Sequence, residues 1–148
     1  MILELENLTK EKISSDFFKE IAQIALKEAG FEKTDRVEIN LALVDDEKIK
    51  ELNAKYRGQD KVTDVLSFAQ TDDFIQPPDQ INHLGEILIC LSQAQRQAQD
   101  LKVELQQELA RLFIHGILHL LGYDHKEDEA AKTMRQLEEK ILKKVNIK

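Results

Sequence analysis

Phe113-Ile-His-Gly-Ile-Leu-His-Leu-Leu-Gly-Tyr-Asp-His125 constrains the architecture more strongly than any other segment of the chain. Apolar residues surround its first two histidines on nearly every side, which is typical of a helix buried in a protein core. Gly122 can adopt a positive φ, so it is expected to end this helix and to turn the chain back. The segment therefore predicts a buried central helix over roughly 104–121, followed by a second helix over 127–145.

Three of the four histidines fall in this segment. His115 and His119 lie one turn apart on one helix face, and His125 can return beside them after the glycine turn. A single histidine in a buried helix usually needs only one hydrogen-bond partner, whereas three would need three partners unless they share a cation. Three imidazoles with an open fourth position are a common catalytic zinc coordination. The spacing therefore predicts a metal site at the end of the buried helix.

The identity of the metal and of the proton acceptor is less constrained. Imidazoles also suit nickel, copper, iron or cobalt, but zinc is favoured because the pattern offers neither a carboxylate ligand nor a redox partner. Metzincin peptidases share the histidine spacing and place a glutamate base directly after the first histidine. Gly116 occupies that position here, so peptide hydrolysis would lack its base. Asp124 is a candidate either for a base or for an acceptor that orients a histidine.

The composition indicates one folded domain spanning residues 1–148. Hydrophobic residues make up 42% and charged residues 33% of the chain, and no apolar run approaches the length of a membrane span. The first residues lack the pattern of a signal peptide, and Cys90, the single cysteine, fits a reducing compartment. These features predict a cytoplasmic location. The net charge of -7 argues against a general nucleic-acid coat protein, although a local basic cleft stays open.

The periodicity of the remaining chain predicts an α/β fold with a small mixed sheet of about four strands and about five helices. Ile49, Leu52 and Tyr56 are expected to form one apolar stripe on the second helix. The predicted elements before the central helix are a strand at 1–5, a helix from Ser14 or Ser15 to Ala29, a strand at 37–44, a helix from Asp45 or Asp46 to Gly58, a strand at 65–68, a loop at 71–82, a strand at 84–91 and a helix capped by Ser92.

A second chemical feature lies in residues 53–68. Lys55, Arg57 and Lys61 gather here in an otherwise acidic chain, and the planar fork of Arg57 suits a phosphate. On its own the stretch equally fits a helix C-terminus with favourable positive charge, followed by a turn and a strand.

These two stretches resemble the YbeY family of bacterial endoribonucleases, also called rRNA maturation factors. The matching features are Tyr56-Arg57, Thr63-Asp-Val-Leu-Ser-Phe68, Leu84-Gly-Glu-Ile87 and His115-Gly-Ile-Leu-His-Leu-Leu-Gly-Tyr-Asp-His125. The chain departs from the family pattern at Val62 and Ala69, where proline is usual, at Glu86, where aspartate is common, and at Cys90, where serine is common. None of these departures touches a predicted metal ligand.

The resemblance implies a single-strand-specific, metal-dependent endoribonuclease that matures ribosomal RNA, notably the 3′ end of small-subunit rRNA. It implies zinc on His115, His119 and His125 and contact of Arg57 with RNA. The expected partners are single-stranded RNA, ribosomal RNA, and the small subunit or an associated protein. The attacking group is either a zinc-activated water or the RNA 2′-hydroxyl. A non-catalytic ribosome-assembly factor and a degenerate metzincin-like peptidase are the alternatives.

Two further residues are expected to have minor roles. His83, after the proline-containing loop, is interpreted as a solvated loop residue. Cys90 is interpreted as a buried strand residue rather than a ligand or nucleophile, because nothing near it in sequence would activate its thiol.

Overall fold

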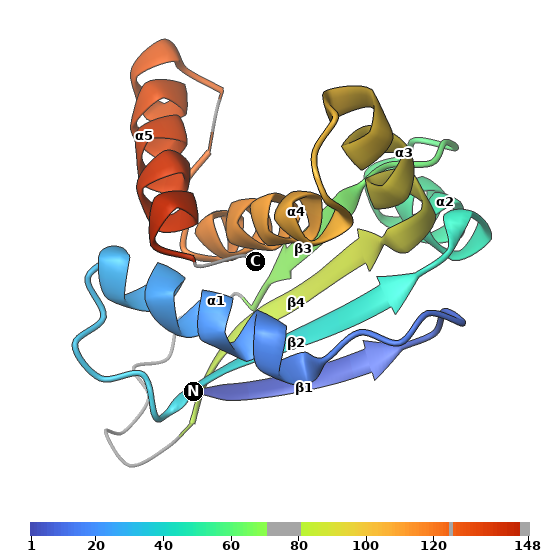
Figure 1. Cartoon of the computed structure of the whole chain (residues 1–148). Coiled ribbons are helices and arrows are strands. Elements are labelled where there is room, and N and C mark those ends of the chain that lie inside the picture. The colour runs from blue at the N-terminus through green and yellow to red at the C-terminus, as the bar shows by residue number, and fades with distance from the viewer. Residues whose placement is uncertain (71–80, 125, 146–148) are drawn as a thin grey trace.

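The computed structural model describes residues 1–70, 81–124 and 126–145 of the chain. In these residues, four strands and five helices follow one another in the order predicted from the sequence (Figure 1). The elements are β1 (Ile2–Asn7), α1 (Ser15–Glu28), β2 (Val37–Val44), α2 (Asp46–Arg57), β3 (Val65–Ala69), β4 (Asn82–Cys90), α3 (Leu91–Leu101), α4 (Leu105–Leu120) and α5 (Asp128–Lys144).

The strands form one mixed sheet in the order β1-β2-β4-β3. β1, β2 and β4 run parallel, while β3 pairs antiparallel with β4 and forms one edge of the sheet. The prediction of a small mixed sheet is therefore confirmed. Because β3 is an edge strand, one side of its backbone is left for other groups to contact.

Both faces of the sheet are covered. The second halves of β2 and β4, residues 41–44 and 87–90, are buried on both sides, which explains why their sequences are continuously apolar there. On one face, Ile39, Leu41 and Ile87 pack with α1, α4 and α5, whose arrangement is visible in Figure 1. On the other face, Leu66 and Leu88 join a smaller cluster with residues of α2.

The helix α4 crosses the sheet at unusually close range. A Cβ atom added at Gly116 would lie 2.9 Å from Cγ2 of Ile87 and 3.1 Å from Oγ of Ser67. The Ser67 hydroxyl also donates a hydrogen bond to the Gly116 carbonyl oxygen, at 3.4 Å. The absence of a side chain at position 116 is thus what allows α4 to rest against β3 and β4.

Three local expectations are wrong. Ser92 does not cap α3: the helix begins two residues earlier, at Leu91 with Cys90 as its N-cap residue, and the Ser92 hydroxyl instead donates to Oδ1 of Asp46. His83 belongs to β4 rather than to a loop, because that strand starts at Asn82. Tyr56 is 54% exposed and does not extend the buried stripe of α2. Of the predicted loop 71–82, residues 71–80 lie outside the described residues.

Candidate functional site

His115 and His119 occupy the last turns of α4 and face one another. Their Nε2 atoms are 3.0 Å apart, and their rings meet edge to face with centroids 4.5 Å apart. In a tetrahedral zinc site with bonds of about 2.0–2.1 Å, two such nitrogens would be about 3.3 Å apart. The helical spacing of four residues therefore brings two nitrogens close to the separation that one zinc ion requires.

The ring of His115 is held from behind by Glu138 of α5. Its Nδ1 lies 2.6 Å from Oε1 of Glu138, and both side chains are largely shielded from solvent. A carboxylate on Nδ1 fixes the tautomer that leaves the Nε2 lone pair available, as is usual for metal-bound histidines. Sequence reasoning missed this residue. The available signal was its position between the buried Met134 and Ile141 on the inward face of α5.

The chain turns sharply after α4, as predicted. Gly122 has a φ of 96°, and the Tyr123 amide donates to the Leu118 carbonyl oxygen. Asp124 is exposed, and its Oδ1 accepts a hydrogen bond from the Lys126 amide. His125, the third predicted ligand, lies outside the described residues, and among the residues that are described no cluster of three or more metal-ligating side chains occurs.

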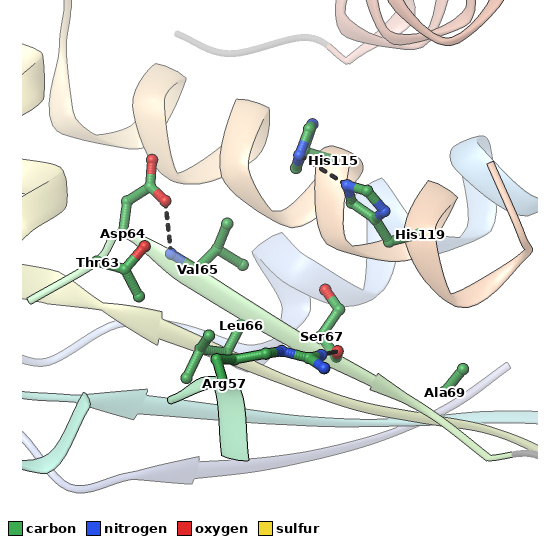
Figure 2. Close-up of a pocket in the computed structure, with 9 residues that line it drawn as sticks. All are labelled: Arg57, Thr63, Asp64, Val65, Leu66, Ser67, Ala69, His115 and His119. Carbon is green, nitrogen blue, oxygen red and sulfur yellow. Dashed lines mark hydrogen bonds between the residues drawn. The ribbon is translucent and has the colours of Figure 1, made fainter. Parts of the chain in front are cut away.

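A surface cavity of about 600 Å³ opens between the two histidines and the edge strand β3 (Figure 2). Backbone and side chains of β3 form one wall, and the histidines of α4 form the other. Asp64 is the one carboxylate among the lining residues that the structure describes, and its Oδ1 accepts from the Val65 amide at 2.7 Å. The lining residues are Arg57, Thr63, Asp64, Val65, Leu66, Ser67, Ala69, His115 and His119.

Arg57 reaches this cavity from the end of α2, which stops at Gly58 in the left-handed conformation. Its Nη2 donates to the Ser67 carbonyl oxygen at 2.7 Å, and its guanidinium lies 4.8 Å from the centroid of the Phe68 ring. A guanidinium carries five N–H donors, so others stay available for an anion while one holds the β3 edge. The structure thus brings Arg57, His115 and His119 to one cavity, although they are far apart in sequence.

Other candidate residues lie apart from the cavity. His83 forms a 2.6 Å contact with Glu38 across the β2–β4 pair. Cys90 is fully buried at the end of β4, and burial raises the pKa of its thiol, so its interpretation as a buried strand residue is confirmed. Asp46 binds Arg96 through both carboxylate oxygens, and this hydrogen-bonded pairing lowers the pKa of Asp46 to about 2.

The fold and the cavity define a small α/β protein with a candidate histidine metal site beside an edge strand. A family model described as Endoribonuclease YbeY matches residues 4–146, so the chain belongs to the YbeY endoribonuclease family. The resemblance inferred from the sequence motifs is thereby confirmed.

Comparison with individual proteins supports this family assignment. Endoribonuclease YbeY of Heliobacterium modesticaldum is 43% identical over 151 residues, covering 95% of this chain and 90% of that protein. Endoribonuclease YbeY of Aquifex aeolicus is 41% identical over 143 residues, covering 96% and 91%. A solution structure of a protein from Thermotoga maritima matches with a TM-score of 0.64 and 32% identity, covering 97% of this chain and 89% of that one.

Proposed function

We propose that this protein is a zinc-dependent endoribonuclease that cuts single-stranded RNA during ribosomal RNA maturation in the cytoplasm. The observation that carries the proposal is the convergence of two histidine Nε2 atoms, 3.0 Å apart, on a cavity that Arg57 also lines. Family membership supplies the RNA substrate, because the similar proteins carry the name endoribonuclease. The described helices include none long and apolar enough to cross a membrane.

His115, His119 and His125 would hold the zinc ion. The Nε2 atoms of the first two are 3.0 Å apart, close to the separation that zinc ligands need, and the chain turns at Gly122 before it reaches His125. A bound zinc ion supplies Lewis acidity, polarising a phosphodiester oxygen and making water nucleophilic near neutral pH. Glu138 keeps the His115 ring oriented for this task through its contact with Nδ1.

Arg57 would bind the phosphate group and stabilise the charge that develops on it. Its guanidinium is pre-oriented on one side by the Ser67 carbonyl oxygen and on one face by Phe68. A donor held in place before the reaction stabilises developing charge better than a mobile one, because it need not reorganise. Asp64 lines the cavity and is the better placed proton acceptor, whereas Asp124 is exposed and is not among the residues that line it.

A peptidase is disfavoured by two features of the same cavity. Gly116 lies against Ile87 and Ser67, so the glutamate base of a metzincin could occupy that position only if Ile87 or α4 moved. An extended peptide substrate would also pair with the free edge of β3, but Arg57 already bonds the Ser67 carbonyl oxygen on that edge.

The test compares metal content and cleavage of single-stranded RNA in three proteins: wild type, His119→Ala and His83→Ala. His83 is a matched control, because it is a histidine that does not line the cavity. We expect His119→Ala to lose both zinc and cleavage, and His83→Ala to keep both. If zinc-loaded wild type leaves the RNA intact while a control ribonuclease cuts it, the protein is instead a non-catalytic assembly factor that zinc stabilises.

A second experiment addresses the partner. We expect the protein to associate with the small ribosomal subunit or with a protein bound to it. Cosedimentation measures that association: the full chain is centrifuged with intact small subunits, with small subunits stripped of their proteins, and alone. If as much of the chain pellets alone as with subunits, the expected association is contradicted.

A further inference from the structure

A cluster of aromatic and basic side chains adjoins the cavity at the end of α2. Tyr56 packs edge to face against Phe68, with ring centroids 5.4 Å apart, and Arg57 lies over the Phe68 ring. The Lys55 ammonium lies 5.2 Å from the centroid of the Tyr56 ring. The cluster therefore runs from the cavity wall at Arg57, across Phe68, to Tyr56 at the surface.

Folding alone does not account for the exposure of Tyr56. Single exposed apolar residues are common on protein surfaces, and Leu8 and Leu101 are comparable cases here. Tyr56 differs from them because its ring packs against the ring of Phe68, which also contacts the guanidinium of Arg57. Even with the contacts to Phe68 and Lys55, 54% of the residue stays exposed. The result is an aromatic ring fixed in orientation and open to solvent.

The charge around Tyr56 favours a nucleic-acid ligand. Lys55, Arg57 and Lys61 fall within seven consecutive residues of a chain whose net charge is -7. Aromatic rings next to basic side chains bind single strands by stacking on the bases while the cations contact the phosphates. In a duplex the base faces are covered by their neighbours, so such a ring selects unpaired RNA.

We infer that Tyr56 is a stacking platform for an unpaired nucleobase that flanks the phosphate bound by Arg57. This inference rests on the proposed RNA substrate and names the contact that makes single strands the preferred form. Phe68 positions both partners: it orients the Tyr56 ring and supports the Arg57 guanidinium, so base and phosphate are bound side by side.

The test is equilibrium binding of a short, fluorescent, cleavage-resistant single-stranded RNA to the zinc-loaded full chain, measured by anisotropy, while an unmodified RNA of the same sequence reports cleavage on gels. Three variants are compared with wild type. Tyr56→Leu keeps an apolar contact with Phe68 but removes the ring, and Tyr56→Phe keeps the ring without the hydroxyl. Leu101→Ala is the matched control, because it trims an equally exposed apolar residue on another helix.

Loss of base stacking should weaken binding of Tyr56→Leu by roughly 5- to 100-fold. Tyr56→Phe and Leu101→Ala should bind as wild type does. A series of the same RNA with one abasic nucleotide at each position in turn identifies the base: at one position the abasic RNA weakens wild type but not Tyr56→Leu. That non-additivity is the signature of direct stacking.

Three results would overturn the inference: wild-type affinity in Tyr56→Leu, equal weakening in Tyr56→Phe and Tyr56→Leu, or an unchanged effect of Tyr56→Leu with every abasic RNA. Each of these comparisons is made under conditions in which wild type binds the intact RNA. A wild-type protein that neither binds nor cuts it contradicts the proposed function itself, which separates the two failures.

Discussion

Replacement of Gly116 by alanine measures how tightly α4 is pressed against the sheet. The added methyl group would meet Cγ2 of Ile87 at 2.9 Å and Oγ of Ser67 at 3.1 Å. The Ser67 hydroxyl can rotate away. Ile87 cannot, because it is fully buried in a central strand and its β-branched side chain has little freedom about χ1.

Two effects of opposite sign compete in this variant. Alanine favours a helix over glycine by about 1 kcal/mol. Insertion of a methyl group into a filled core costs about 1 to 3 kcal/mol. Because the blocking atom belongs to a rigid side chain, we expect the packing cost to fall in the upper part of its range, about 2 to 3 kcal/mol, which leaves a net loss of about 1 to 2 kcal/mol. For a chain of this size that loss lowers Tm by about 2 to 8 °C.

Urea denaturation of four proteins tests this reasoning: wild type, Gly116→Ala, Ile87→Ala and the double variant. Ile87→Ala alone should cost about 2 to 5 kcal/mol, because it leaves a cavity. In the double variant the new methyl group fills part of that cavity. The loss of stability in the double variant should therefore be smaller than the sum of the two single losses, by about 0.5 kcal/mol or more. A Gly116→Ala protein that is as stable as wild type, or strictly additive losses, would refute the close-packing argument.

Three further changes probe the site and its surroundings. Glu138→Gln should weaken zinc binding by about 10-fold or more in a chelator-competition titration, since the charged acceptor behind His115 is lost. Glu139→Gln changes the exposed neighbouring residue and should leave the zinc affinity unchanged. Asp64→Asn keeps the acceptor for the Val65 amide and should lower kcat for RNA cleavage with little change in KM; an unchanged kcat excludes Asp64 as the proton acceptor. Asp46 has a pKa lowered to about 2 from the ordinary 3.8, so its ionised form stabilises the fold above the ordinary pKa and loses that effect as pH falls through the lowered one. The excess stability of wild type over Asp46→Asn, measured by urea denaturation, should therefore shrink between about pH 4 and pH 2, and a constant difference would contradict the ion pair with Arg96.

The parts of the site that follow from local geometry were predictable from the sequence. Helical periodicity alone places His115 and His119 on one face, and Gly122 adopts the positive φ expected of a helix-ending glycine. The order of strands and helices followed in the same way from periodicity and turn residues. Each of these features depends on residues within a few positions of one another.

The parts that the sequence did not predict depend on contacts between distant segments. The Glu138–His115 pair spans 23 residues and requires the packing of α5 on α4. The anchor of Arg57 on the Ser67 carbonyl oxygen involves a backbone atom, which no residue pattern reports. The close packing at Gly116 brings β3 and β4 against a helix that follows them in the chain.

The error at Tyr56 has a specific physical cause. The inward face of α2 carries Ile49 and the polar Asn53, which is buried because its Nδ2 donates to the Lys61 carbonyl oxygen at 3.0 Å. A hydrophobic pattern cannot identify an asparagine as an inward residue, so the predicted stripe followed Leu52 to Tyr56 instead. With Ile49 and Asn53 facing inward, Tyr56 lies at the surface. The hydrogen bond from Asn53 to the Lys61 carbonyl oxygen also links the segment after α2 to that helix.

Gly116 links the packing of the fold to the chemistry that its histidines support. The same histidine spacing serves peptidases when a glutamate follows the first histidine, because that carboxylate then acts as the base. In this chain the position is filled by the sheet: Ile87 and Ser67 lie where the side chain would begin. A base for the proposed RNA cleavage would therefore have to come from another element, and Asp64, on the β3 side, lines the cavity. Arg57 lines the same cavity, so a carboxylate on the β3 side would suit the proposed phosphodiester substrate, with its phosphate bound by the guanidinium.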